Sequence, residues 1–266
     1  MVPTRLRMVL WGACAVSVFY NTNLCGATRF FADGFENGFV NWNIEPRASS
    51  IDTTYAHSGA CSHRSVFSPY PHPTIAILNF KHPASNKLFL RFHWLMKDVP
   101  EGFGKLGRFN AVSGGTAGME LWYDKSWTTG IFWSAAGTEL KGSFDGRWPG
   151  NKVSEQNVWH KYEVFIEYNV PVSAANGRLR LWIDRPDDLP FESANAYKPI
   201  DVQNCQFRNT AVPCVYEMLH LPTNYNNVGG ATYFDDVELW DGLPDVLPPR
   251  PEDSPPPSAP KIQLDY

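Results

Sequence analysis

The sequence predicts a single all-β domain built as a sandwich of sheets, and three observations carry this prediction. Acidic motifs stand near both ends of the chain, at Phe31–Gly38 and Thr232–Gly242. Between them apolar residues recur with period two, and helical periodicity is hard to find. Turn dipeptides such as Asn176-Gly177 and Gly229-Gly230 separate the alternating stretches. Because the first and last strands of extracellular sandwiches often lie side by side, we expect the two acidic motifs to meet.

The first 27 residues are predicted to be a secretory signal peptide rather than part of the fold. Arg5 and Arg7 precede an apolar run of 13 residues, Met8–Tyr20, and small residues precede the expected cleavage point after Ala27. The run is shorter than the roughly 20 residues that span a bilayer, so a membrane anchor is the weaker alternative. We therefore expect a secreted or periplasmic protein without a membrane span.

The charge of the mature chain limits its partners. Without residues 1–27 the chain has 21 Lys and Arg against 27 Asp and Glu, a net charge of −6. A mildly acidic surface argues against nucleic acid as a partner. It leaves an anionic substrate open, because a local basic groove can lie within a negative surface. We expect the mature chain to be a monomer.

Four stretches show the clearest strand alternation. They are Leu88–Lys97, Met119–Lys125, Lys161–Asn169 and Arg178–Asp184. In each stretch one face is apolar and suits a core, whereas the other face is polar but still carries aromatic side chains. A fully solvated face would not need Trp122, Phe165 or Trp182. The chain has ten Trp, a density that suits both sandwich cores and platforms on which sugar rings stack.

The sequence also predicts the bounds of the domain and one long irregular region within it. We expect residues 28–244 to form the domain and residues 245–266 to form an extended, disordered Pro-rich tail. Residues 185–230 contain five prolines and are predicted to be a long irregular region. Such a region inside a compact domain is usually functional or forms a rim.

Three cysteines remain after the signal peptide is removed. Cys205 and Cys214 flank a short polar stretch, and in an oxidising compartment we expect a local disulfide between them. Cys61 is then left over, either as a buried residue or as a free thiol. The three cysteines have no matching His spacing and therefore do not predict a zinc site.

Five segments together resemble a known family of folds. They are Asp33–Trp42, Ala56–Ser62, Trp159–Glu163, Asn176–Asp184 and Tyr233–Trp240. The set is similar to the concanavalin-A-like jelly rolls of secreted polysaccharide lyases, in particular the heparin-lyase-I-like and the glucuronan- or alginate-lyase-like groups. The resemblance covers most of residues 30–243 and marks the fold more than the chemistry.

The resemblance implies β-elimination on a uronic-acid polymer. This reaction needs a group that neutralises the uronate carboxylate, a base that removes the neighbouring proton, and an acid that protonates the leaving oxygen. Arg91 and His93 lie two residues apart on one strand, so their side chains share a face. We expect His93 to be the base and Arg91 the neutralising cation. The alternative is a hydrogen-bonded sheet residue beside a surface charge.

Other residues complete the expected site. Lys105 and Arg108, in a glycine-rich segment, could approach an anionic sugar closely, and the alternative is an ordinary basic loop. Tyr225, in a polar loop before the last strand, is the favoured general acid. The residues expected to stack on or bind the sugar are Trp122, Trp133, Arg180 and Trp182.

Four carboxylates in the two end motifs are candidate calcium ligands. They are Asp33, Glu36, Asp235 and Asp236. Hard oxygen ligands suit Ca²⁺, and the ion would have a structural role. The alternative is a hydrogen-bonded strand junction without metal. No catalytic cofactor is expected.

Two other classes of function stay open. The outer motifs also resemble secreted carbohydrate-binding modules, so a non-catalytic carbohydrate-binding protein is the main alternative. A structural or adhesive protein with a Pro-rich spacer is the third. The Glu-x-Asp-x-x-Glu pattern of glycosidases that share this sandwich is absent, which disfavours hydrolysis by two carboxylates.

Overall fold

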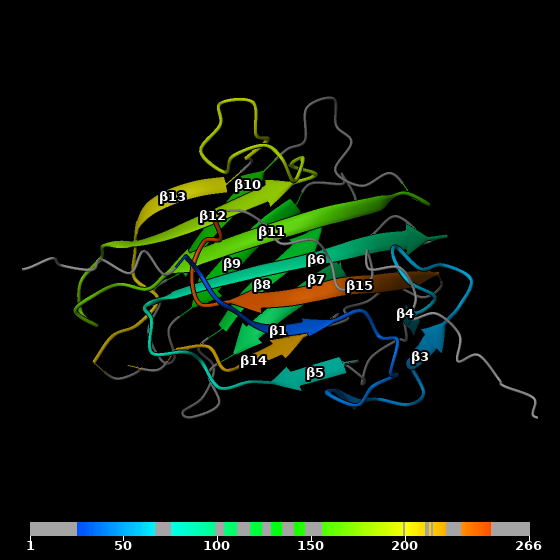
Figure 1. The fold of residues 1–266 in the computed structure, drawn as a ribbon. Coiled ribbons are helices and arrows are strands. Elements are labelled where there is room, and N and C mark those ends of the chain that lie inside the picture. The colour runs from blue at the N-terminus through cyan, green and yellow to red at the C-terminus, as the bar shows by residue number, and fades with distance from the viewer. Residues whose placement is uncertain are drawn as a thin grey trace, which may run out of the picture.

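The computed structural model shows two antiparallel sheets stacked as a sandwich (Figure 1). It describes residues 26–66, 76–98, 104–110, 118–123, 129–134, 141–146, 156–198, 200–210, 213, 215–221 and 230–245. Every regular element in these ranges is a β-strand. The predicted all-β fold is therefore confirmed.

The larger sheet contains eight of the described strands. In spatial order they are β13 (Ile200–Cys205), β12 (Gly177–Ile183), β11 (Trp159–Glu167), β6 (Lys87–Lys97), β15 (Ala231–Trp240), β4 (Ser62–Val66) and β3 (Ser49–Asp52), and β1 (Arg29–Asp33) also pairs with β15. The long strands β11, β6 and β15 lie next to one another in the middle of this sheet (Figure 1).

The smaller sheet contains seven of the described strands. In spatial order they are β10 (Lys141–Gly146), β9 (Thr129–Ser134), β8 (Gly118–Tyr123), β7 (Gly104–Asn110), β14 (Met218–His220), β5 (Ala76–Asn79) and β2 (Asn43–Ile44). Strand β14 is inserted between β7 and β5, so a late segment of the chain completes the centre of this sheet.

The core lies between the sheets and is built from one face of each alternating strand. The larger sheet contributes apolar side chains such as Phe92, Val164 and Leu181, and the smaller sheet contributes Phe109 and Leu219, all buried. Successive strand residues point to opposite faces, so the residues between these core positions point away from the sandwich interior. The period-two pattern is thereby confirmed for the three predicted strands of the larger sheet, and the described core residues of β8, Met119 and Leu121, agree with it.

The two acidic end motifs meet, as expected. Strand β1 pairs antiparallel with β15, with Arg29 opposite Trp240 and Asp33 opposite Val237. Figure 1 shows β1 in blue beside β15 in orange. The pairing joins the beginning and the end of the described domain in one sheet.

The predicted irregular region 185–230 is partly wrong, because it contains two strands. Strand β13 forms one edge of the larger sheet, and the three-residue β14 lies within the smaller sheet. Residues 185–198 have no strand and pack over the larger sheet through side chains such as Phe191.

Several expectations concern residues outside the described ranges. The signal peptide and the tail beyond residue 245 are among them and stay predictions. Cys205 is a buried free thiol and Cys214 is not described, so the disulfide between them also stays a prediction. Within the described residues, no helix is long and apolar enough to cross a bilayer.

Candidate functional site

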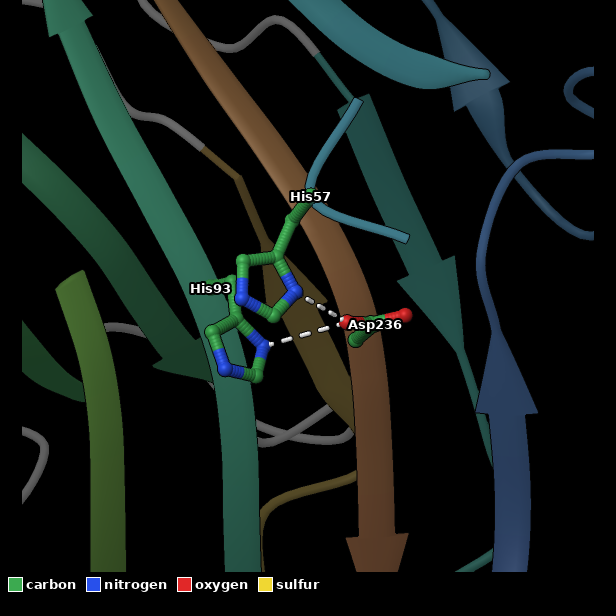
Figure 2. Close-up of side chains that lie close together, drawn as sticks. All are labelled: His57, His93 and Asp236. Carbon is green, nitrogen blue, oxygen red and sulfur yellow. Dashed lines mark hydrogen bonds and ion pairs between the residues drawn. The ribbon is translucent and has the colours of Figure 1, made fainter. Parts of the chain in front are cut away.

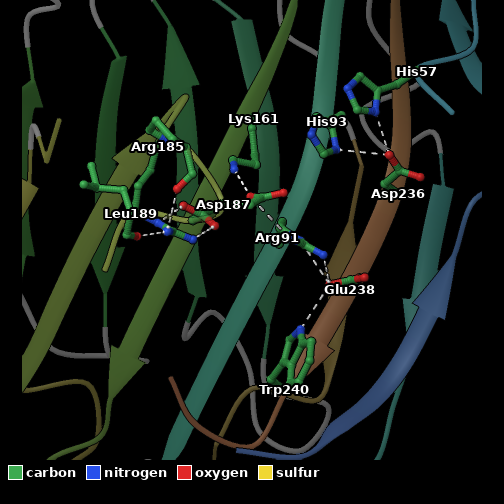
Figure 3. Close-up of polar contacts among 12 residues, drawn as sticks. His57, Arg91, His93, Lys161, Arg185, Asp187, Leu189, Asp236, Glu238 and Trp240 are labelled. Atoms are coloured by element: carbon green, nitrogen blue, oxygen red, sulfur yellow. Dashed lines mark hydrogen bonds and ion pairs between the residues drawn. The ribbon is translucent and has the colours of Figure 1, made fainter. Parts of the chain in front are cut away.

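The outward face of the larger sheet carries charged residues that are buried and paired with one another. Arg91 on β6 donates from Nε to Glu238 Oε2 at 3.0 Å, and its Nη2 lies 2.7 Å from the same oxygen. Glu238 also binds Arg29 at 2.8 Å and the indole of Trp240 at 3.2 Å (Figure 3). Arg91 is 1% exposed. Its charge is therefore committed to a structural ion pair and is not available to a substrate.

A second buried pair lies beside the first. Both guanidinium nitrogens Nε and Nη2 of Arg185 contact the carboxylate of Glu163, at 2.8 and 2.7 Å. Arg185 also donates to the backbone carbonyl of Leu189, which ties residues 185–189 to the sheet (Figure 3). Lys161 and Asp187 form a further ion pair on this face.

Residues 185–196 cover the expected sugar platform on this face. Trp182 is 0% exposed, and its indole nitrogen donates to the carbonyl of Phe191 at 3.1 Å. Arg180 pairs with Glu192 and lies over the rings of Phe165 and Trp182. The expectation that Trp182 and Arg180 bind a sugar is therefore not kept, because this segment occupies the space above them.

His93 lies in a compact group with His57 and Asp236 (Figure 2). Its Nδ1 is 3.3 Å from Asp236 Oδ2, and Nδ1 of His57 is 2.6 Å from the same oxygen. The two imidazole rings stack with centroids 3.6 Å apart. His93 and Arg91 do share a face, as predicted, but Arg91 is paired with Glu238 and the ring of His93 is stacked on that of His57, so a catalytic role for this pair is disfavoured.

The side chain of the neighbouring Asp235 binds the backbone of the loop that precedes β4. Its carboxylate accepts hydrogen bonds from the backbone nitrogens of His57, Ser58 and Asp236 at 2.8, 3.3 and 2.8 Å. Burial, with the charge of Asp236 beside it, raises the pKa of Asp235 to about 8.

The expected calcium ligands from the first motif hold loops in place. Asp33 accepts hydrogen bonds from the backbone of Phe35 at 2.8 Å and from the indole of Trp42 at 3.0 Å. Glu36 accepts a hydrogen bond from the backbone nitrogen of Cys61 at 2.8 Å. These contacts are those of a hydrogen-bonded strand junction, which was the alternative to calcium.

Oxygen groups of both motifs nevertheless line one surface pocket. The pocket has a volume of about 200 Å³, and its lining includes Asp33, Glu36, Asp236 and Glu238 but not Asp235. Within the described residues, the four predicted ligands do not come close enough to one another to form a single metal-ligand group. Calcium therefore stays a prediction, and nothing below depends on it.

The outward face of the smaller sheet brings a cation and an imidazole together. Arg108 on β7 lies directly opposite His220 on β14 in the strand register. Their neighbours Phe109 and Leu219 point into the core, so Arg108 and His220 point to the other face. Nδ2 of Asn110 lies 3.0 Å from Nε2 of His220. Burial and the charge of Arg108 lower the pKa of His220 to about 4, so its ring is neutral at physiological pH.

Other expected site residues are only partly described. The strand register places Lys105 opposite Trp122, and Trp133 opposite Met119, in the same sheet as Arg108. The side chains of Lys105, Trp122 and Trp133 lie outside the described part of the structure, as does all of Tyr225. Their expected roles stay predictions.

Sequence reasoning missed His220, Asn110 and His57. The sequence around His220 has no polar and apolar alternation that would mark a strand, because Tyr216 and Met218 are as apolar as Val215 and Leu219. No local signal marks His57, which lies in a loop and meets His93 only through the fold.

Comparison with protein-family models and with curated protein sequences gives no match. Solved structures are similar in fold. An endo-β-1,4-glucuronan lyase from the fungus Trichoderma reesei has a TM-score of 0.57 and 14% identity, over 82% of this chain and 98% of that one. The cellulose-induced protein Cip1 has a TM-score of 0.52 and 14% identity, over 79% and 96%.

A third similar structure is the receptor-binding domain of the botulinum neurotoxin C/D mosaic serotype. It has a TM-score of 0.51 and 9% identity, over 82% of this chain and 49% of that one. At such low identities these similarities establish the jelly-roll sandwich and leave the activity open.

Proposed function

We propose that this chain is a secreted lyase that cleaves a uronic-acid polysaccharide by β-elimination on the outward face of its smaller sheet. The observation that carries the proposal is the pairing of Arg108 with His220 across adjacent strands. A fixed cation beside a neutral imidazole is the combination that proton abstraction next to a carboxylate requires.

The roles follow from the charges. The Arg108 guanidinium binds the uronate carboxylate and spreads the negative charge that develops when the neighbouring carbon loses its proton. The His220 imidazole accepts that proton. The electron pair forms a carbon–carbon double bond as the bond to the leaving oxygen breaks, and Tyr225, five residues after His220, donates a proton to that oxygen.

The roles expected for Arg91 and His93 are thereby transferred to the other face of the sandwich. Arg91 is neutralised by Glu238, and a substrate carboxylate would have to displace this buried partner. Arg108 lies between His220 on β14 and Glu120 on β8 in the strand register, and its guanidinium is proposed to bind the anionic sugar. Lys105 and Trp122 lie opposite each other on β7 and β8 of this sheet and are proposed to contact neighbouring sugars. Trp133 on β9 lies opposite the core residue Met119 and is not part of this proposal.

The proposal is tested by mixing the protein with glucuronan, alginate, pectate and heparin and following the ultraviolet absorbance of the unsaturated uronate. We expect one polymer to give a rise. His220→Ala should slow it by at least about 100-fold, the usual contribution of a general base. Arg108→Ala should slow it by about 100- to 1,000-fold.

The matched control is His160→Ala, because His160 lies on β11 of the larger sheet, where its Nδ1 is 2.8 Å from Asp184. This variant should keep the activity of the unchanged protein. Equal rates in His220→Ala and His160→Ala would refute the proposed site, even if the chain is a lyase.

The second candidate is a non-catalytic carbohydrate-binding protein that uses the same outward face of the smaller sheet. Its signature would be saturable binding to a polysaccharide with no absorbance change for any polymer. In that case Arg108→Ala should weaken binding while His220→Ala leaves it nearly unchanged.

A further inference from the structure

Three potential metal ligands from separate segments meet on the outward face of the larger sheet. His57 belongs to the loop between β3 and β4, His93 to β6, and Asp236 to β15 (Figure 2). Their ligand atoms all lie within 4.8 Å of one another. Among the residues that the structure describes, no other group of three or more His, Cys, Asp and Glu side chains meets this criterion.

An irregularity in β15 brings the carboxylate to this group. The register between β15 and β6 shifts between Asp235, opposite His93, and Glu238, opposite Arg91. Asp236 lies in this bulge with φ of 49°, a left-handed conformation that Asp tolerates better than most residues. Bulges redirect side chains, and this one directs Asp236 towards the imidazoles.

The separations suit a small metal ion bound at bond lengths near 2.1 Å. Two ligands of a tetrahedral zinc ion lie about 3.4 Å apart at such bond lengths. Asp236 Oδ2 is 3.3 Å from His93 Nδ1 and 2.6 Å from His57 Nδ1. The shorter contact has to open slightly, and the His57 ring has to turn from its stacked position, which lies 12° from parallel to the His93 ring.

The surroundings hold the carboxylate and leave a route for an ion. The second carboxylate oxygen, Oδ1, accepts a hydrogen bond from Ser58 Oγ at 2.5 Å, which fixes the orientation of Oδ2. The side chains of His93 and Asp236 are each 5% exposed, whereas that of His57 is 21% exposed. An ion can therefore reach the group from the loop side.

We propose that His57, His93 and Asp236 bind one divalent first-row metal ion, for which zinc is the best match. Two imidazole nitrogens and one carboxylate oxygen form a donor set typical of zinc and its neighbours, whereas Ca²⁺ takes oxygen ligands. The ion would join the loop before β4 to the two central strands. This site is separate from Arg108 and His220 and does not depend on lyase activity.

The test uses the full chain after removal of metal with a chelator. Cobalt is added and followed by its visible absorbance, and zinc binding is measured by calorimetry. We expect one ion per chain and a rise in the midpoint of thermal unfolding with zinc. His57→Ala should weaken binding by about 100-fold or more, since loss of a ligand should cost at least as much as loss of an outer-shell partner.

His160→Ala is the matched control, because His160 pairs with the carboxylate of Asp184 and is not part of a metal-ligand group of described residues. It should bind cobalt and zinc like the unchanged protein. His93→Gln is a second test, and it should also weaken the binding of cobalt and zinc. Cooperative unfolding of its metal-free form would show that this variant is folded. Absence of a cobalt band, or unchanged zinc affinity in a folded His57→Ala variant, would overturn the proposal.

Discussion

At the residue scale, burial separates the ion pairs that matter for stability from those that do not. The Glu163–Arg185 pair has side chains no more than 1% exposed, whereas Arg178 and Asp201 form a pair at the sheet edge that is about one quarter exposed. Removing one partner of a buried pair leaves an uncompensated charge without water, whereas a surface charge is readily solvated.

Glu163→Gln is therefore expected to lower the free energy of unfolding by about 3–5 kcal/mol. Arg178→Gln should lower it by no more than about 1 kcal/mol, because water replaces its partner. Urea denaturation of both variants at neutral pH checks the difference. Equal losses of unfolding free energy would mean that the buried Glu163–Arg185 pair stabilises the fold no more than the exposed pair does.

The titration of His220 predicts the pH dependence of the proposed activity. A general base acts only when it is deprotonated, so activity should be lost as the pH falls through the pKa of His220. Burial and Arg108 lower this pKa to about 4. The value of kcat/KM should then stay level down to about pH 5 and fall below it. A fall centred on the ordinary histidine pKa, about 6.5, would argue against His220 as the base.

At the scale of the element, β12 begins where three strands come unusually close. A Cβ atom on Gly177 would lie 2.7 Å from the carbonyl oxygen of Glu167 on β11 and 2.8 Å from that of Cys205 on β13. Both neighbours are backbone atoms in hydrogen-bonded strands. They cannot move aside as a flexible side chain would.

Gly177→Ala should therefore destabilise the protein by about 3 kcal/mol, the upper end of the cost of overpacking. The matched change is Gly242→Ala, whose Cβ would meet only the side chain and Cα of Ala27, at 3.3 and 3.9 Å. It should change stability by less than about 1 kcal/mol. Thermal unfolding of the two variants measures the difference, and similar midpoints would refute the clash.

The long strands could be predicted from the sequence, whereas the short ones could not. Strand β6 has eleven residues, enough for its alternation to stand out. Strand β14 has three residues, and β13 is an edge strand that follows a proline and has half of its residues exposed. Short strands are specified by the neighbours with which they pair, and those neighbours are distant in the sequence.

The same reasoning explains what was missed at the candidate sites. Alternation correctly placed Arg91 and His93 on one face, because that relation is local. The contact of Arg91 with Asp187 and the stacking of His57 on His93 depend on the path of loops. The pairing of Arg108 with His220 depends on where β14 inserts, which a period-two pattern does not determine.

At the scale of the whole molecule, Asp235 should make folding depend on pH. Its pKa of about 8 in the folded protein exceeds the ordinary value of 3.8. Between these values the folded protein holds a proton that the unfolded chain releases, so stability should fall as pH rises from about 4 to 8. The slope for one proton is at most about 1.4 kcal/mol per pH unit.

Thermal unfolding between pH 5 and pH 8 measures this slope. Asp235→Asn should flatten it, because a neutral side chain has no proton to exchange in this range. Other titrating groups contribute equally to both proteins, so the difference between the two curves isolates Asp235. Parallel curves would mean that Asp235 is ionised in the folded protein throughout.

The antiparallel pairing of β1 with β15 decides how this domain responds to force. Arg29, at the start of β1, is the partner of Trp240, at the end of β15. A force applied at these two residues therefore acts perpendicular to the strands. In this unzipping geometry the hydrogen bonds between β1 and β15 break one after another. Shearing would instead load all of these bonds at once. A domain tethered through its ends should peel open at low tension, beginning at this strand pair.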